Sequence, residues 1–337
     1  SISINMAITL AVDAMGGDFG PRVTVPATLA ILKKSPQLSV IFVGQESQIQ
    51  SHLKNLATDI SARITVVHTD EMVTMDDKVA VALRNKRQSS MRLAINLVHE
   101  KKADACISAG NTGALMAISR FVLKTHANID RPAILAPLPT QTGQVYMLDL
   151  GANIDSEPQH LMQFALMGDV VARALAGIHK PRIGLLNIGE EEIKGNDLIK
   201  QTHQLLKLST LNYIGYVEGD GVFKGEADVV ICDGFVGNIA LKTSEGVAKM
   251  MANFIKQEVN RNWLTKLTGA MAYPIWKGLK KKMNPSNYNG ASLVGLTGIV
   301  IKSHGSADED SFAQAVTVAI KAVEQDIPSL IAANMVQ

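Results

Sequence analysis

The sequence has few of the features that mark secreted, metal-binding or nucleic-acid-binding proteins. Its 337 residues include only two cysteines, Cys106 and Cys232, which lie far apart in apolar runs. Such a pair supplies neither a disulfide framework nor a zinc site. The 33 basic and 31 acidic residues leave a net charge of +2, without the basic excess typical of nucleic-acid binders. We therefore expect no metal site, no nucleic-acid partner and a cytoplasmic setting.

Targeting and membrane-spanning signals are also missing. Residues 1–20 have no basic head and turn acidic at Asp13, unlike a signal peptide. No run reaches the roughly 20 apolar residues that cross a bilayer. We find no low-complexity linker and no internal repeat, and hydrophobic residues make up 47% of the chain. The sequence therefore predicts a single α/β catalytic domain over residues 6–331.

What the sequence does contain is a recurring unit, in which a short apolar run ends in a glycine-rich polar loop and a helical pattern follows. This alternation predicts a mostly parallel sheet with helices on both sides. Ser89 or Ser90, Asn196 and the Asp308–Asp310 group are expected to cap helices. The six runs predicted as strands are Ile8–Met15, Ala105–Ser108, Val145–Leu150, Ile183–Ile188, Val229–Asp233 and Gly298–Lys302.

One basic segment departs from this alternation. Residues 256–283 carry seven basic residues against one acid, Glu258. The centre of the segment, Leu267–Trp276, is uncharged and contains Pro274. Apolar residues from Val247 onward recur at helical spacing before it. We predict a projecting helical hairpin over residues 245–285 that turns near Gly269–Pro274.

The glycine-rich loops are candidate anion sites, because backbone N–H groups and helix N-termini favour negative charge there. The alternative is that the glycines only make tight turns. No G-x-G-x-x-G fingerprint and no P-loop motif is present, so dinucleotide and ATP sites lack their motifs. The candidate substrate-binding and phosphate-binding residues are Asp13, Gly16, Gly17, Gly110, Thr112, Gly113, Gly151, Asn153, Gly234, Gly237 and Asn238.

Three residues are candidates for catalysis. Asn111 follows a glycine at a strand end, where its amide could donate to an oxyanion or cap a helix. Lys194 could hold phosphate as a compact charge or stand in an exposed loop. His304 could act as an acid or base, or be structural. The cysteines lie within predicted strands, which favours a place in the core over a nucleophilic role.

Taken together, several segments resemble the phosphate acyltransferase family, in the family's order and over nearly the whole chain. One departure is Val79, where many relatives have proline. The segments that carry the resemblance are Val12–Asp18, Ser108–Ala114, Asp149–Asn153, Leu186–Glu191 with Lys194–Gly195, Cys232–Phe235 with Gly237–Asn238, Tyr288–Ala291 and Lys302–Gly305.

The resemblance implies a three-layer α/β/α fold similar to phosphotransacetylases and to isocitrate and isopropylmalate dehydrogenases. It implies transfer of a fatty acyl group from acyl carrier protein to inorganic phosphate. No cofactor is expected, because phosphopantetheine arrives on the carrier. The resemblance further implies a homodimer at an anionic membrane surface, whose acyl phosphate product serves a membrane glycerol-3-phosphate acyltransferase in phospholipid synthesis.

Two other functions remain possible from the sequence. An NAD-dependent hydroxyacid dehydrogenase would share the fold, but it needs clustered acidic metal ligands and a nicotinamide site, and neither pattern is visible. A membrane-recruited scaffold would use the basic hairpin and leave the six glycine loops unexplained. The hairpin tip itself could meet the membrane, a second copy of the chain or the acidic carrier protein.

Overall fold

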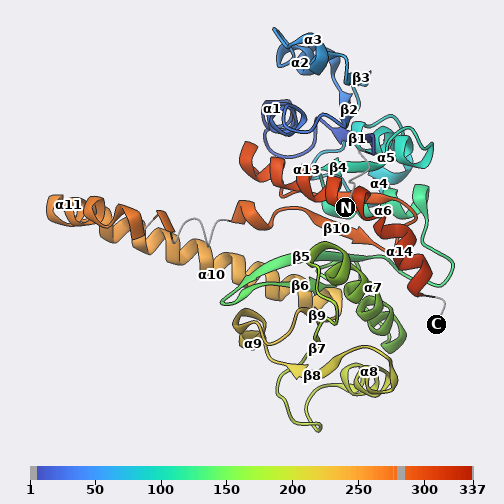
Figure 1. The fold of residues 1–337 in the computed structure, drawn as a ribbon, viewed down its shortest axis with the longest axis vertical. Helices are drawn as coiled ribbons and strands as arrows, with labels where there is room; N and C mark the ends of the chain where they lie inside the picture. The colour runs from blue at the N-terminus through green and yellow to red at the C-terminus, as the bar shows by residue number, and fades with distance from the viewer. Residues whose placement is uncertain (1–5, 276, 279–284, 336–337) are drawn as a thin grey trace.

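The computed structural model describes residues 6–275, 277–278 and 285–335. Within them, eleven strands form one sheet in the order β3-β2-β1-β4-β11-β10-β5-β6-β9-β7-β8 (Figure 1). Each of the six predicted runs contains a strand of this sheet. The strands are β1 (Ile8–Asp13), β2 (Leu38–Gly44), β3 (Ile64–His68), β4 (Ala105–Ser108), β5 (Ala133–Thr140), β6 (Gly143–Leu148), β7 (Ile183–Leu186), β8 (Tyr213–Val217), β9 (Val229–Ile231), β10 (Ala291–Val294) and β11 (Ile299–Lys302).

The sheet is mostly parallel, as predicted, but it consists of two parallel blocks. Strands β3, β2, β1, β4 and β11 form one block, and β6, β9, β7 and β8 form the other. Strands β10 and β5 join them through antiparallel pairs, so the blocks run in opposite directions along the ladder. Neighbouring strands twist by roughly 20–25°. Seven steps separate β1 from β7 in the sheet.

Helices cover both faces of the sheet, which gives the expected three layers. On one face a continuous core lies beneath α4, α5, α6, α9 and the start of α10. On the other face, α1, α2, α3 and α13 cover the first block, and α7, α8 and α14 cover the second. These helices are α1 (Pro21–Leu32), α2 (Glu46–Ser51), α3 (Thr58–Ser61), α4 (Val79–Asn85), α5 (Ser90–His99), α6 (Thr112–Leu123), α7 (Pro158–Ala176), α8 (Asp197–Leu208), α9 (Gly219–Lys224), α10 (Gly234–Asn260), α13 (Glu309–Glu324) and α14 (Ile327–Asn334).

The predicted helix caps are confirmed. The side chain of Ser89 accepts a hydrogen bond from the first turn of α5 at 3.2 Å. Asn196 does the same for α8 at 3.0 Å, and Asp308 does so for α13 at 2.9 Å. Each cap satisfies a backbone N–H that the helix leaves free, a contribution of about 0.5–2 kcal/mol.

Two helices lie within the predicted hairpin segment, joined by a turn that was not predicted, and the second ends at Met271, within the Gly269–Pro274 stretch where the predicted turn was placed. Helix α10 is 27 residues long and projects from the sheet (Figure 1). Helix α11 (Trp263–Met271) packs against its outer end. Asn262 caps α11 through a capping box with Thr265, so the chain turns at Arg261–Asn262. Gly269 lies inside α11, facing Val259 so closely that a Cβ would come within 2.9 Å of it. The later part of the predicted segment, with Trp276 and residues 279–284, lies outside the described residues.

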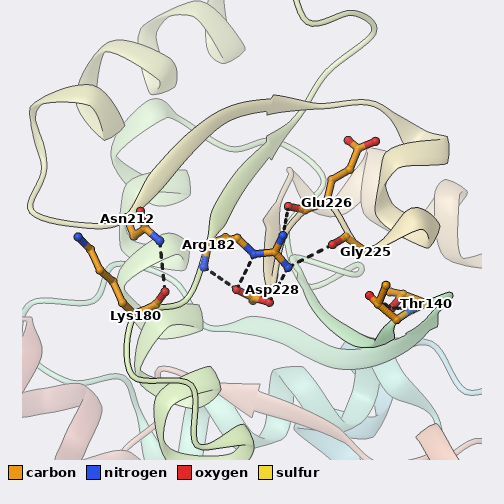
Figure 2. A network of polar contacts seen from close by, with 8 residues as sticks. Thr140, Lys180, Arg182, Asn212, Gly225, Glu226 and Asp228 are labelled. Carbon is orange, nitrogen blue, oxygen red and sulfur yellow. Dashed lines mark hydrogen bonds and ion pairs between the residues drawn. The ribbon is translucent and has the colours of Figure 1, made fainter.

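An arginine joins the loops that precede β7 and β9 (Figure 2). The guanidinium of Arg182 forms two hydrogen bonds with the Asp228 carboxylate, at 3.1 and 3.0 Å. It also donates to the carbonyl groups of Gly225 and Glu226 at 3.1 and 2.9 Å. These carbonyls follow α9, so Arg182 fixes the end of that helix to the sheet. The network lies at the amino ends of β7 and β9, away from the glycine loops.

Candidate active site

A buried carboxylate organises the ends of β1 and β4. The side chain of Asp13 accepts hydrogen bonds from the hydroxyl groups of Ser90 at 2.6 Å and Ser108 at 2.7 Å. The Ser108 hydroxyl in turn accepts the Gly110 backbone N–H at 3.0 Å. Burial raises the pKa of Asp13, and the hydrogen bonds from Ser90 and Ser108 oppose that rise. Asp13 therefore holds β1, α5 and the loop after β4 together from inside the protein.

The loops after β1, β4 and β11 meet one another, and we call them the first loop cluster. A Cβ on Gly16 would lie 2.9 Å from the Gly110 nitrogen. A Cβ on Gly17, whose φ is +86°, would lie 3.0 Å from the Gly305 carbonyl oxygen. Real Cβ atoms do not come so close to backbone atoms, and L side chains rarely adopt that φ. Glycine is therefore required for the three loops to approach.

Lys302, which was not among the predicted site residues, ends β11 in this cluster. Its side chain is buried, with a 9% exposed fraction, and its residue pairs with Ser108 on β4. The ammonium donates to the carbonyl of Ser303, and no described carboxylate forms an ion pair with it. Burial and the nearby charge of Lys242 lower the pKa of Lys302 to about 8, against the attraction of Asp13 and Asp18. The sequence did carry a signal for this residue, because Lys302 directly ends an apolar strand run. Lysine is almost never buried unless it is paired, so a lysine in such a place is unusual.

His304 lies two residues further on, where α10 passes over the end of β11. Its backbone N–H donates to the Asn289 side chain at 3.0 Å. The ring is only partly shielded from water, yet this shielding is the largest cause of its lowered pKa. Lys302, Lys242 and Lys249 lower the pKa further, and Glu245 opposes them. The structure therefore brings His304 together with cations of β11 and α10.

Asn111 acts as a helix cap in this structure. Its side-chain oxygen accepts the Ala114 N–H at 3.1 Å at the start of α6. Its amide donates to the carbonyls of Met75 and Asp77 at 3.0 and 3.1 Å. The amide predicted as an oxyanion donor is thus engaged in holding residues 74–77 against α6. The neighbouring Thr112 and Gly113 are exposed in the first turn of α6.

The loops after β6 and β9 form a second loop cluster around Asp149. This fully buried carboxylate accepts five hydrogen bonds, from the backbone N–H groups of Ile134, Gly151, Ala152 and Asn153 and from the Asn153 amide, at 2.8–3.2 Å. Burial raises the pKa of Asp149, and these hydrogen bonds oppose that rise. The backbone donors predicted to face a ligand at Gly151–Asn153 are therefore used by the protein itself.

The start of α10 completes the second loop cluster. A Cβ on Gly234 would overlap the Asn153 carbonyl, and one on Gly237 would overlap the Asp149 carbonyl. Asn238 donates to the Leu150 carbonyl at 3.2 Å. These glycines are needed for close approach of backbones, and the Asn238 amide ties α10 to the loop after β6. Helix α10 thus begins at the second loop cluster and reaches the first.

Comparison with known proteins identifies the family. A family model described as fatty acid synthesis protein matches residues 8–330. The phosphate acyltransferase of Alcanivorax borkumensis is 58% identical over 325 residues, which cover 96% of each chain. That of Methylococcus capsulatus is 54% identical over 327 residues, covering 97% of this chain and 96% of the relative. The chain belongs to the phosphate acyltransferase family. It is an acyltransferase, and the resemblance seen in the sequence is confirmed.

Solved structures confirm the α/β fold of this phosphate acyltransferase family member. A phosphotransacetylase from Streptococcus pyogenes has a TM-score of 0.60 and 19% identity, covering 94% of each chain. A phosphotransacetylase from Staphylococcus aureus has a TM-score of 0.58 and 16% identity, again over 94% of each chain. At such identities the likeness shows the shared fold.

Lys194 lies in the loop between β7 and α8. None of its described contacts is with either loop cluster. The residue is exposed, and its ammonium makes no hydrogen bond or ion pair with another described residue. The loop that carries it is tethered through Glu192, which pairs with Lys207 at 2.5 Å and lies 3.8 Å from His203 Nε2. The other ring nitrogen of His203 shares a 2.6 Å hydrogen bond with Tyr213. The Lys194 ammonium therefore has no partner among the described residues, while the loop that carries it is held in place through Glu192.

Both cysteines are core residues, as their sequence context predicted. Cys106 and Cys232 are buried, and neither forms a disulfide. Burial raises the pKa of both thiols, and nearby aspartates raise it further. A thiol with a raised pKa carries little thiolate at neutral pH, so neither cysteine has the reactivity of a nucleophile.

Neither a metal-binding cluster nor a membrane-spanning helix occurs among the described residues. No group of three or more His, Cys, Asp or Glu side chains among them could hold a metal ion. In the same part of the chain, no helix has both the length and the apolar character needed to cross a bilayer.

Proposed function

We propose that this enzyme transfers a fatty acyl group from acyl carrier protein to inorganic phosphate and releases an acyl phosphate. The observation that carries the proposal is the buried Lys302 at the meeting point of three glycine loops, beside His304 and the cations of α10. A site that is positive and short of carboxylate partners suits an oxyanion substrate. Membership of the phosphate acyltransferase family supports phosphate as the acceptor.

The chemistry needs no covalent enzyme intermediate. A phosphate oxygen attacks the thioester carbonyl, a C–O bond forms, and the carbonyl oxygen becomes an oxyanion. The C–S bond then breaks, and the carrier's phosphopantetheine leaves as a thiolate. The protein's part is to orient phosphate and to stabilise the developing charge. Because its pKa is lowered, His304 is neutral at neutral pH, which favours orienting the phosphate over protonating the sulfur.

The test is a phosphate-dependent release of carrier thiol. Purified protein is incubated with acyl carrier protein bearing a long acyl chain, with and without inorganic phosphate. Free thiol is measured, and acyl phosphate is trapped with hydroxylamine as the hydroxamate. We expect equal amounts of thiol and hydroxamate, both dependent on phosphate. Thiol release without phosphate would indicate a thioesterase and contradict the proposal.

We further propose that α10 and α11 contact another surface. Many exposed apolar side chains lie along these helices and on the residues that follow α11, as at surfaces that bind a protein or a membrane. Basic residues Lys256, Arg261 and Lys266 flank it. An anionic membrane, a second copy of the chain and the acidic carrier protein all suit this arm, and a membrane position would deliver product to a membrane glycerol-3-phosphate acyltransferase. The exposed apolar residues are Val247, Met250, Met251, Phe254, Trp263, Leu264, Leu267, Met271, Tyr273 and Ile275.

Replacing Met271 and Ile275 by asparagine separates these partners. Both side chains are more than two-thirds exposed, at 77% and 71%, so the fold should survive. We expect salt-sensitive flotation with phosphatidylglycerol vesicles to be lost while carrier-dependent activity in solution remains. A variant that becomes monomeric by light scattering yet still floats would assign the tip to a dimer. A raised KM for the carrier would assign it to carrier docking.

A further inference from the structure

The ammonium of Lys302 has more hydrogen-bond donors than acceptors. A protonated lysine carries three N–H bonds, but among the described residues its ammonium donates only to the Ser303 carbonyl. The nearby Asp13 carboxylate is occupied by two serine hydroxyls at 2.6 and 2.7 Å. A buried, under-partnered cation is costly unless a ligand completes its shell. The position of Lys302 therefore points to an anion that binds there.

A second cation reaches the same place from a different element. Lys242 lies two turns into α10 and is close enough to Lys302 to lower the pKa of that residue. It also acts on His304. The Lys242 side chain is 61% exposed, and its ammonium pairs with Glu245 at 3.0 Å on the same helix. Like charges repel, so an anion bound near Lys302 and Lys242 would relieve the repulsion between these two cations.

The glycine loops leave a small hollow at these strand ends. A small cavity is lined by residues of the loops after β1, β4 and β11, including Gly16, Gly17, Ala109 and Gly305. Without side chains, these loops leave their backbones within reach of a ligand. Lys302 ends the strand that leads into one of these loops, although neither it nor Lys242 of α10 lines the cavity itself.

We propose that Lys302 of β11 and Lys242 of α10 together form the subsite for inorganic phosphate, with Glu245 as an internal competitor. This inference rests on the proposed function and specifies which groups hold the acceptor. In the free enzyme, Lys242 pairs with Glu245. When phosphate binds Lys302, Lys242 exchanges the carboxylate for the phosphate oxygens. Since α10 also forms the projecting arm, the arm and the phosphate subsite share one helix.

The first experiment measures phosphate binding without the carrier. The rise in Tm caused by inorganic phosphate is compared among the unaltered protein, Lys302→Met, Lys242→Met and the control Lys200→Met, whose lysine is exposed on α8. The KM for phosphate is measured beside the KM for acyl carrier protein. We expect phosphate affinity to fall about tenfold or more for Lys302→Met and about threefold for Lys242→Met. The carrier KM and the control should stay unchanged.

If either variant keeps the unaltered protein's phosphate response, the two-lysine subsite is wrong. Should Lys302→Met fail to fold, Lys242→Met decides, because its side chain is exposed and its loss leaves the core intact. A protein that converts no acyl carrier protein but still shows a lysine-dependent phosphate response would sink the proposed function alone. An active enzyme with unchanged phosphate KM in both variants would sink this inference alone.

The second experiment tests a substitution that should strengthen phosphate binding. Glu245→Gln removes the competitor and frees Lys242, so we expect the phosphate KM to fall about twofold to threefold. The double change Lys242→Met with Glu245→Gln should lose this gain, because the freed lysine is then absent. A Glu245→Gln variant with weaker phosphate binding would show that Glu245 supports the ligand, and would overturn its role as a competitor.

Discussion

The two loop clusters are built from the same kind of sequence but use their polar groups differently. In the second loop cluster, Asp149 takes up five hydrogen-bond donors. In the first, Asp13 is satisfied by Ser90 and Ser108, and Lys302 remains without a carboxylate partner. One cluster is therefore self-contained, whereas the other has positive charge to offer a ligand.

This difference shows that a glycine-rich loop at a strand end is not in itself an anion site. What decides is whether the donors around it are already used inside the protein. The second cluster then serves as a rigid base for α10, which carries Lys242 to the first cluster. On this view the largest effects on stability belong to the second cluster, and the largest effects on phosphate binding belong to the first.

Removing the Asp149 side chain should have the largest effect. Asp149→Ala leaves four backbone N–H groups and the Asn153 amide without their acceptor inside the protein. We expect the free energy of unfolding to fall by about 3–5 kcal/mol, measured by urea denaturation. The control is Asp155→Ala, because Asp155 is exposed and makes only a surface ion pair with Arg131; its effect should stay below about 1 kcal/mol.

A small effect of Asp149→Ala would mean that water replaces the carboxylate in the second loop cluster. The backbone donors of Gly151–Asn153 would then be free to bind a ligand, and the contrast between the two clusters would disappear.

Much of the fold could be predicted because local patterns and tertiary structure agree. Each predicted apolar run contains a strand, since strands buried on both faces need continuous apolar residues. The caps at Ser89, Asn196 and Asp308 follow from single side chains acting on the next turn. The antiparallel join between the two blocks could not be predicted, because pairing partners are set by contacts distant in sequence. The turn before α11 was not predicted, because the cap at Asn262 is a weaker sequence signal than Pro274 and Gly269.

The candidate site was harder to predict than the fold. The loops after β1, β4 and β11 do meet, whereas the binding role of their glycines stays a prediction. The amides of Asn111, Asn153 and Asn238 were expected to face a ligand, but each donates to a backbone carbonyl of the protein. A sequence does not show which donors are already used. Lys302 was not predicted as a candidate site residue. The sequence does not show that its side chain is buried without a carboxylate partner among the described residues.

The pH dependence of phosphate binding tests whether the first cluster depends on a titrating lysine. The pKa of Lys302 is about 8 in the free protein, with Asp13 and Asp18 raising it and Lys242 lowering it. His304 has a lowered pKa and stays neutral in this range. Phosphate needs the charged lysine, so affinity should be full below pH 8 and fall as pH rises above it, by about tenfold per unit once the lysine is neutral.

Titration calorimetry with inorganic phosphate, in buffers from neutral to alkaline pH, measures this fall. The inflection should be absent in Lys302→Met, whose residual binding stays flat. An affinity that is constant across this range in the unaltered protein would show that Lys302 does not contact phosphate.

The substitution Lys194→Ala compares the contribution of exposed Lys194 to phosphate binding with that of buried Lys302. Lys194 has no ion-pair partner among the described residues. Its side chain is exposed, so solvent screens its charge. We expect the KM for phosphate to rise about two- to fivefold, less than for Lys302→Met, with the carrier KM nearly constant. Lys194→Arg should keep most of the affinity, since it keeps the charge. If Lys194→Ala raised the KM for phosphate more than Lys302→Met, the phosphate site would lie in the loop after β7. The second block of the sheet, and not the first, would then bind phosphate.

The smallest effect is expected from the cysteines, one of which lies in each block of the sheet. Cys106 is buried within β4, and the Cys232 thiol donates to the Asp149 carbonyl at 3.4 Å. Because both thiols have raised pKa values and phosphate itself attacks the thioester, the double change Cys106→Ala with Cys232→Ala should keep kcat and both KM values within about twofold. Stability can fall modestly from the lost packing, so activity is measured well below Tm. Acid quenching followed by mass spectrometry of the unaltered enzyme should find no acylated cysteine. An acyl group trapped on Cys106 or Cys232, together with loss of turnover in the double variant, would replace direct attack by phosphate with a covalent mechanism.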